Sequence, residues 1–271
     1  MINEIIENGM CPNLVQTHVQ FPCKMCDKVH SISKGKRIPS KSPCLITIME
    51  GMDGGVLSIL QTLSSLDWKI MIFQVLWALY SMQQSWGMSH GDVGLRNIFF
   101  TTTEKGGFWS YDDNFKTEYI IPKTYHTFYL GDYGECQSDR FFGTNGGKTV
   151  GGNLRDLETG KVGIGDPFDN PKQQTGRSMT QNDATAFLED LKKHNPPEDV
   201  SKEILAPFSR ILKSKTYYSG MVLNYSKVIK ALFQKIFKPS KENPRFFVVM
   251  KRVISPDMDE LYFQLAFYDC H

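Results

Sequence analysis

Three polar side chains stand beside two strand-like segments, and their types suit one kind of chemistry. Asp92 and Asn97 lie five positions apart in a loop that precedes the apolar run Ile98–Phe100. Asp132 follows the next such run, Thr127–Leu130, and is flanked on both sides by nearby glycines. This order predicts that all three side chains lie at one end of a two-stranded ribbon.

The chemistry that these residue types support is phosphoryl transfer. Amide and carboxylate oxygens such as those of Asn97 and Asp132 suit a Mg²⁺ ion that bridges phosphates. A further carboxylate, Asp92, would orient an attacking hydroxyl group and accept its proton.

A long helix is expected to position this loop from its N-terminal side. From Ser65 onward, apolar residues recur at intervals of three and four, which places them on one helical face: Leu66, Ile70, Phe73, Trp77 and Tyr80. Gly87 is a suitable stop for this helix.

The rest of the chain reads as a mixture of helices, strands and loops. We expect a helical end at Glu4–Asn8, extended segments at Leu14–Phe21 and Cys44–Glu50, a loop over 22–43, a polar and aromatic insertion over 103–126, and a long mobile loop over 143–180. Helical periodicity returns at Asp183–Lys193, Ser201–Lys213 and Met221–Phe237. The C-terminal two-thirds should therefore be mainly helical.

Composition excludes several classes of protein. With 271 residues, 41% hydrophobic and 22% charged, the chain can bury a sizeable core. Its longest apolar stretch, Ile70–Tyr80, is too short for a bilayer, and the acidic N-terminus has no secretory pattern. We expect an intracellular, cytoplasmic protein without a membrane partner, whose six cysteines are mostly free thiols.

Charge is uneven near the C-terminal end. Residues 201–252 hold twelve Lys and Arg side chains against only Glu203 and Glu242. This excess could attract an acidic partner, or it could be an ordinary solvated helical face. Because no recognition motif accompanies the charge, we do not expect nucleic acid as a partner.

Two loops resemble a known family. His90-Gly91-Asp92-x4-Asn97 resembles the catalytic loop of eukaryotic-type protein kinases, and Asp132-Tyr133-Gly134 resembles their metal-binding Asp-Phe-Gly turn. The Gly after the loop histidine is similar to divergent kinase-like proteins of large cytoplasmic DNA viruses.

Neighbouring segments follow the family's order. The long helix resembles helix E, and Leu45–Met52 resembles the fifth strand and hinge. Cys11-Pro12-Asn13 resembles the His-Pro-Asn entry to the fourth strand, and Asp183 resembles the aspartate that opens helix F and anchors the catalytic loop.

The resemblance implies an α+β, protein-kinase-like fold with a mainly helical C-lobe and a truncated N-lobe. The kinase-like domain would span 1–240, with an N-lobe remnant and hinge in 1–50 and the C-lobe in 51–240, followed by an extension at 241–271 that packs on the C-lobe. The implied function is that of a Ser/Thr protein kinase that acts on a protein substrate with ATP and Mg²⁺. If the chain is viral, it would act in the host cytoplasm or the virion.

The resemblance also assigns roles to residues. Asp92, His90 and Arg96 would form the catalytic group, with Asp92 as the base. Asn97 and Asp132 would hold Mg²⁺ and, with the hinge residues Met49, Glu50 and Met52, contact the nucleotide.

The sequence departs from the family in ways that keep two other functions open. No Gly-x-Gly-x-x-Gly loop and no Val-Ala-x-Lys strand precede the match, Gly91 replaces the usual Arg, and Gly94 stands where a Lys is common, so that Arg96 is its possible stand-in. A pseudokinase or scaffold without transfer activity is one alternative. A small-molecule kinase of the aminoglycoside or choline type, which shares His-Gly-Asp-x4-Asn, is the other.

Two further motifs are weaker. Cys23-x-x-Cys26, with Cys11 and Cys44 on either side, has the residue types of a zinc site, but ordinary thiols are the simpler interpretation. The glycine-rich run Gly143–Lys148 lacks the spacing of a phosphate-binding loop.

Overall fold

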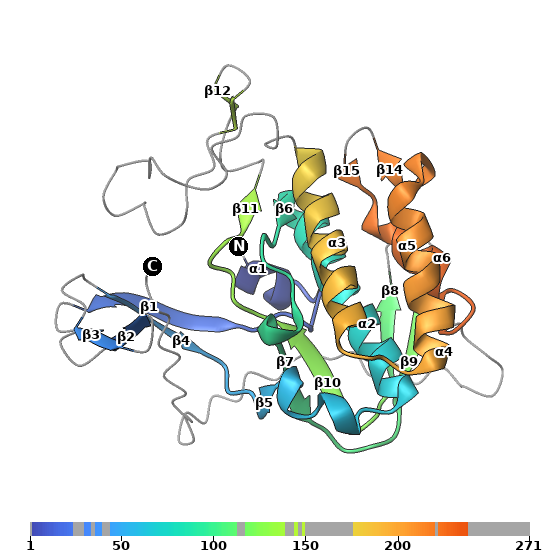
Figure 1. Cartoon of the computed structure of the whole chain (residues 1–271), viewed down its shortest axis with the longest axis horizontal. Helices are drawn as coiled ribbons and strands as arrows, with labels where there is room; N and C mark the ends of the chain where they lie inside the picture. The colour runs from blue at the N-terminus through green and yellow to red at the C-terminus, as the bar shows by residue number, and fades with distance from the viewer. Residues whose placement is uncertain are drawn as a thin grey trace. The chain divides into compact units, whose positions relative to one another are not determined.

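The computed structural model describes residues 2–23, 30–33, 36–39, 44–112, 117–138, 144–145, 148–149, 176–219 and 222–237. The chain divides into two compact units. The larger unit takes in residues 3–14 and the described residues from Met52 onward, and the smaller takes in 15–51. Helices and strands both contribute, which is compatible with the predicted α+β class (Figure 1).

The long central helix is α2, Ser65–Trp86, and its ends are set by local chemistry. The Ser64 side chain accepts a hydrogen bond from the backbone N–H of Asp67, while the Asp67 carboxylate accepts one from the backbone N–H of Ser64, which forms a capping box. At the other end Gly87 adopts a left-handed conformation with φ of 59°. The predicted stop at Gly87 is confirmed.

Helix α2 is buried around most of its circumference rather than along one stripe. Of the five residues that the sequence places on one helical face, Ile70, Phe73, Trp77 and Tyr80 are buried. Leu66 is 39% exposed because it lies in the first turn, ahead of the continuously buried stretch. A helix covered on nearly all sides must have elements packed against several of its faces.

One of these elements is a three-stranded antiparallel sheet in the order β10-β7-β5. Its strands are β5 (Gly54–Gly55), β7 (Ile98–Thr102) and β10 (His126–Leu130). Leu130 pairs with Ile98, so the end of β10 lies beside the start of β7. Asn97 and Asp132 therefore flank the same end of this ribbon, as the sequence predicts.

The insertion between β7 and β10 forms a second hairpin, β8 (Phe108–Asp112) and β9 (Glu118–Pro122), in which Tyr111 pairs with Tyr119. Both rings are buried and contact Phe73 and Trp77 of α2. The polar and aromatic character of the insertion thus reflects a hairpin with one solvent-facing side and one side packed on α2.

Helices make up most of the described C-terminal part. They are α3 (Gly176–Lys193), α4 (Glu198–Val200), a π-helical segment (Ser201–Leu205), α5 (Ala206–Lys213) and α6 (Tyr225–Phe233), with the 3₁₀ turn Lys215–Tyr217 and the strand pair β14 (Tyr218–Ser219) and β15 (Val222–Leu223) between α5 and α6. The predicted helix at Met221–Phe237 begins later, because Asn224 caps α6 by accepting a hydrogen bond from the backbone N–H of Lys227.

The smaller unit contains the antiparallel pair β1 (Thr17–Cys23) and β4 (Cys44–Met49). The predicted loop over 22–43 is wrong in part, since β2 (His30–Ser33) and β3 (Lys36–Pro39) pair within it. The predicted N-terminal helix is confirmed as α1 (Ile2–Glu7), most of which belongs to the larger unit.

The remaining elements are short: β6 (Met88–Ser89) pairs with β11 (Gln137–Ser138), β12 (Thr144–Asn145) pairs with β13 (Lys148–Thr149), and 3₁₀ turns occupy Val56–Ser58, Leu60–Thr62 and Leu95–Asn97.

Several predicted segments lie outside the described residues. Helix α3 already starts at Gly176, inside the predicted loop over 143–180, but most of that loop and all of 241–271 are not described. Cys26, and the side chains of Cys23 and Cys44, also fall outside the described part. Among the helices described, none is long and apolar enough to cross a bilayer.

The C-terminal cap of α2 gives a direct stability test. Replacing Gly87 by Ala forces a Cβ into the left-handed region and should lower the free energy of unfolding by about 1 kcal/mol. Gly87→Asn should cost less, because Asn tolerates this conformation. Urea denaturation measures both; equal losses for the two variants would contradict the left-handed cap.

Candidate active site

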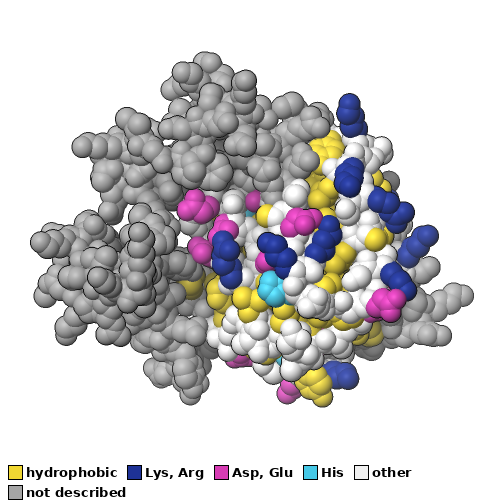
Figure 2. Space-filling model, in the orientation of Figure 1, with side chains coloured by type: hydrophobic (Ala, Val, Ile, Leu, Met, Phe, Trp, Pro, Cys, Tyr) yellow, Lys and Arg dark blue, Asp and Glu magenta, His cyan; other side chains and the backbone are white. Residues whose placement is uncertain are grey.

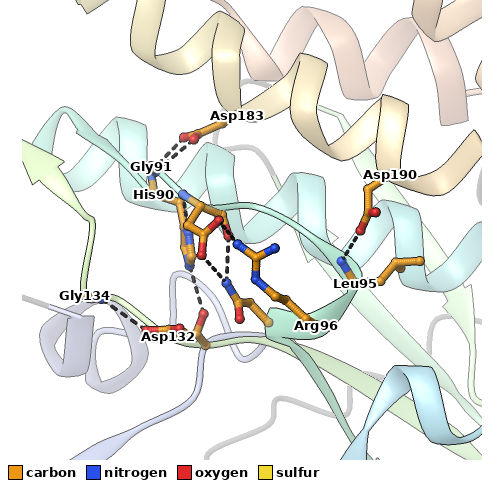
Figure 3. Close-up of polar contacts among 11 residues, drawn as sticks. His90, Gly91, Leu95, Arg96, Asp132, Gly134, Asp183 and Asp190 are labelled. Atoms are coloured by element: carbon orange, nitrogen blue, oxygen red, sulfur yellow. Dashed lines mark hydrogen bonds and ion pairs between the residues drawn. The ribbon is translucent and has the colours of Figure 1, made fainter. Parts of the chain in front are cut away.

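Helix α3 holds the start of the loop that carries Asp92. The two carboxylate oxygens of Asp183 accept hydrogen bonds from the backbone N–H groups of His90, at 2.7 Å, and Gly91, at 2.9 Å (Figure 3). Asp183 is only 2% exposed. The sequence predicts this anchor, although Asp183 is the eighth residue of α3 rather than its first.

Burial disfavours the ionised form of Asp183. Removal from water raises the pKa of Asp183 to about 7, against the opposing effect of the two backbone hydrogen bonds. The nearby charge of Asp92 raises the pKa further. Asp183 is therefore a carboxylate whose ionised form is stabilised chiefly by the loop that it holds.

A second carboxylate of α3, which is not among the residues predicted for the site, holds the end of the same loop. Asp190 accepts a hydrogen bond from the backbone N–H of Leu95 at 2.7 Å. Asp183 and Asp190 are seven positions apart, which is about two helical turns, so both project from one face of α3. That spacing of two aspartates is the signal that points to the pair.

His90 links the loop to the segment that carries Asp132. Its buried ring donates from Nε2 to the carbonyl oxygen of Gly131 at 2.9 Å, and its Nδ1 accepts from the backbone N–H of Asp92 at 3.3 Å. Burial lowers the pKa of His90, which agrees with a neutral ring that donates at one nitrogen and accepts at the other. Both ring nitrogens are thus used in positioning the backbone.

Within the loop, Asp92 is held by two neighbours. The guanidinium group of Arg96 contacts Oδ1 of Asp92, and Nδ2 of Asn97 donates to Oδ2 of Asp92 at 3.0 Å and to its backbone oxygen at 2.8 Å. Burial alone would raise the pKa of Asp92, but these hydrogen bonds and the charge of Arg96 outweigh it, so the pKa lies below its ordinary value. Asp92 is therefore ionised at neutral pH.

A backbone hydrogen bond brings Asp132 close to Asp92 and Asn97. The N–H of Gly131 donates to the carbonyl oxygen of Asn97 at 3.0 Å, which joins the end of β10 to the start of β7. Asp132 itself has φ of 59°, in the left-handed region, and its Oδ1 lies 3.5 Å from the backbone nitrogen of Gly134. The structure thus brings Asp92, Asn97 and Asp132 to one end of the sheet.

The donor set of this site fits Mg²⁺ bound together with phosphates. Because Nδ2 of Asn97 makes its two bonds to Asp92, the amide oxygen is the Asn97 atom suited to a metal, and Asp132 adds a carboxylate. Within the described residues no cluster of three or more His, Cys, Asp or Glu side chains has the geometry of a metal site. Two oxygen ligands from the protein are typical of Mg²⁺ sites that leave the remaining positions to water and phosphate.

Gly91 is required by its surroundings. Its φ is 85°, and a Cβ placed on it would lie 2.3 Å from the carbonyl oxygen of Glu135. Any side chain, including the arginine common in the related motif, would have to displace that backbone. The Gly at this position therefore follows from the close approach of two loops.

The hinge residues are divided between the units. Met49 and Glu50 belong to the smaller unit, where the Glu50 backbone N–H donates to the carbonyl oxygen of Gln16 at 2.9 Å. Met52 belongs to the larger unit and is 8% exposed. Their contact with adenine stays a prediction.

The basic character of the C-terminal part is dispersed. Figure 2 shows Lys and Arg side chains as separate groups along the side of the molecule where α5 and α6 lie. Lys202, in the segment before α5, pairs with Glu198 at 2.5 Å. An acidic partner for this region stays a prediction.

Comparisons with known proteins point in one direction. No family model matches the chain. It is 28% identical over 160 residues to "Probable serine/threonine-protein kinase 380R" of Invertebrate iridescent virus 6, and 27% identical over 158 residues to "Putative serine/threonine-protein kinase 019R" of Frog virus 3 (isolate Goorha). Each match covers 55% of this chain. The chain is a divergent kinase-like protein.

This kinase-like protein spans less than a third of the length of the curated relatives it matches, 29% of the first and 18% of the second. Both relatives come from large DNA viruses and are named as serine/threonine-protein kinases. The resemblance to divergent viral kinase-like proteins is thereby confirmed.

The close approach at Gly91 gives a prediction with a matched control. Gly91→Ala should lower the free energy of unfolding by about 1 to 3 kcal/mol more than Gly9→Ala, because an inserted group must displace packed backbone. Gly9 also has positive φ, 69°, but a Cβ there meets no atom within 4 Å. Chemical denaturation measures both variants. Similar losses would show that strain in φ, and not the contact with Glu135, explains the glycine.

Proposed function

We propose that this chain is a Ser/Thr-type protein kinase that transfers the γ-phosphate of ATP to a protein hydroxyl group. The observation that carries the proposal is the placement of Asp92, Asn97 and Asp132. Asp92 and Asn97 are hydrogen-bonded to each other, and the Gly131–Asn97 backbone bond brings Asp132 beside them. The two relatives that are named as kinases support the same function.

In this proposal Asp92 is the general base. Its low pKa keeps it ionised, and it would orient the substrate hydroxyl and receive its proton at Oδ1. The hydroxyl oxygen would form the new bond to the γ-phosphorus as the bond to the β-phosphate oxygen breaks, which leaves ADP.

Arg96 would have two positions in such a reaction. Its side chain is 67% exposed, so it can leave Oδ1 of Asp92 without disturbing the core. It would then face the negative charge of the transferring group, a role for which Gly94 provides no lysine. His90, which is buried, would keep the backbone of Asp92 and Gly131 in register.

Mg²⁺ with ATP would supply charge neutralisation of the phosphates, and Asn97 and Asp132 would hold it. Met49, Glu50 and Met52 would meet the adenine. We also propose that residues 1–240 form the kinase-like domain, in which 1–50 correspond to the end of an N-lobe and a hinge, and 241–271 an extension. The family's glycine-rich loop and strand lysine have no counterpart within residues 1–50.

A pseudokinase is the second candidate, and a specific observation favours it. Both carboxylate oxygens of Asp92 are engaged within its own loop, by Arg96 and Asn97. A site that keeps this arrangement would bind a nucleotide or a partner without transferring phosphate.

The metal role predicts the effect of Asp132→Asn. Asn tolerates the left-handed backbone at this position but removes the charge, so Mg²⁺-dependent binding of ATP should be lost while the fold is kept. Titration of the purified chain with ATP, with and without Mg²⁺, measures this. Glu104→Gln, which neutralises an exposed acid of the insertion, is the control. Unchanged ATP affinity in Asp132→Asn would exclude the metal role.

The proposed role of Asp92 as general base predicts that Asp92→Asn impairs phosphate transfer and not ATP binding, in contrast to Asp132→Asn. Transfer of labelled phosphate to a mixture of protein substrates should fall by roughly 10² to 10⁴-fold, while Mg²⁺–ATP affinity stays within a few-fold of the parent chain. A parent chain that binds Mg²⁺–ATP but labels no protein would favour the pseudokinase. Labelling of a small alcohol but of no protein would favour the small-molecule kinase.

A further inference from the structure

The hairpin β8–β9 contributes a polar side chain to the interior of the larger unit. Tyr111 is 4% exposed, and its hydroxyl group reaches past the aromatic rings of α2 to two buried amides. It donates to Oδ1 of Asn13 at 2.8 Å and accepts from Nε2 of Gln74 at 3.0 Å. Asn13 and Gln74 are both fully buried.

The same two amides hold one residue of β10 by its backbone. Nδ2 of Asn13 donates to the carbonyl oxygen of Phe128 at 2.9 Å, and the N–H of Phe128 donates to Oε1 of Gln74 at 2.9 Å. The four groups therefore form a closed circuit in which each group donates one hydrogen bond and accepts one, and all bonds run in one direction around the ring. Such circuits strengthen each bond through polarisation.

The circuit lies on the outer edge of β10. Strand β10 is an edge strand of its sheet, so the backbone groups of Phe128 that point away from β7 need partners from elsewhere. The backbone of Asn13 adds a bond here, because its carbonyl oxygen accepts from the N–H of Leu130 at 2.9 Å. Two residues after Leu130 comes Asp132.

We propose that Tyr111 is a positioning residue of the candidate active site: by closing the circuit with Asn13 and Gln74, the insertion hairpin fixes the edge of β10 and thereby the place of Asp132. The positioning of Asp132 for Mg²⁺ rests on the function proposed above, whereas the fixing of β10 does not. The hairpin thus supports the site through its contacts with α2 and β10.

The test variant is Tyr111→Phe, which removes only the hydroxyl and keeps the ring contacts with Phe73 and Trp77. Amide hydrogen exchange of the full chain reads the effect on β10. We expect exchange at Phe128 and Leu130 to become about ten-fold faster, because the circuit loses two of its four bonds, while the core of α2 keeps its protection. The matched control is Tyr125→Phe, whose ring is 58% exposed and lies beside Lys105.

The second readout separates positioning from general stability. In Tyr111→Phe, ATP affinity in the presence of Mg²⁺ should fall by about ten-fold, and ATP affinity without Mg²⁺ should not change, because the effect acts through Asp132. A structural role alone would lower the melting temperature without this dependence on Mg²⁺.

The outcomes are distinguishable. Unchanged exchange at Phe128 and Leu130 overturns the proposal, as does faster exchange with full Mg²⁺-dependent affinity, which would leave the hairpin without a role at the site. If the parent chain binds no ATP, the proposed function fails, and the exchange data alone decide whether Tyr111 fixes β10.

Discussion

A buried carboxylate organises the candidate site. Asp183 lies in the interior of the larger unit and accepts two backbone hydrogen bonds from the loop that carries Asp92. Because burial raises its pKa to about 7, the folded protein binds more protons than the unfolded chain between pH 4 and 7, roughly. Stability from this group therefore decreases as the pH rises through that window. Above pH 7 Asp183 is ionised and lowers the free energy of unfolding. Such locally unfavourable groups are common at functional sites.

The other contacts of the loop extend this constraint. Asp190 holds the far end of the loop, two turns along α3, so one rigid helix sets both ends of the segment between Gly91 and Leu95. His90, at the start of the loop, donates a hydrogen bond to the carbonyl oxygen of Gly131 and so connects the loop to the segment that carries Asp132. Strand β10 packs on α2, and the loop that carries Asp92 connects β6 to β7 of the same sheet as β10. This frame sets where Asp92, Asn97 and Asp132 lie.

The sequence predicts those features whose signals are local. The period of apolar residues identifies α2, Gly87 marks its end, and the spacing of Asp92 and Asn97 identifies the loop. Contacts distant in sequence carry no such signal. Gln74 interrupts an apolar run, and nothing nearby in the chain indicates that it bonds Tyr111 and the backbone of Phe128. The role proposed for the insertion hairpin has no local signal for the same reason, whereas the spacing of Asp183 and Asp190 along one helix does indicate that both lie on one face of α3.

Asp183→Asn tests most directly whether Asp183 holds the loop that carries Asp92. An amide side chain can accept from one backbone N–H but turns its own N–H₂ toward the other, which places donor against donor. Amide hydrogen exchange of the full chain should then show lost protection at His90 and Gly91, with the protection of α2 retained. Unchanged protection at both amides would contradict the account, because the loop would then hold its shape without the carboxylate.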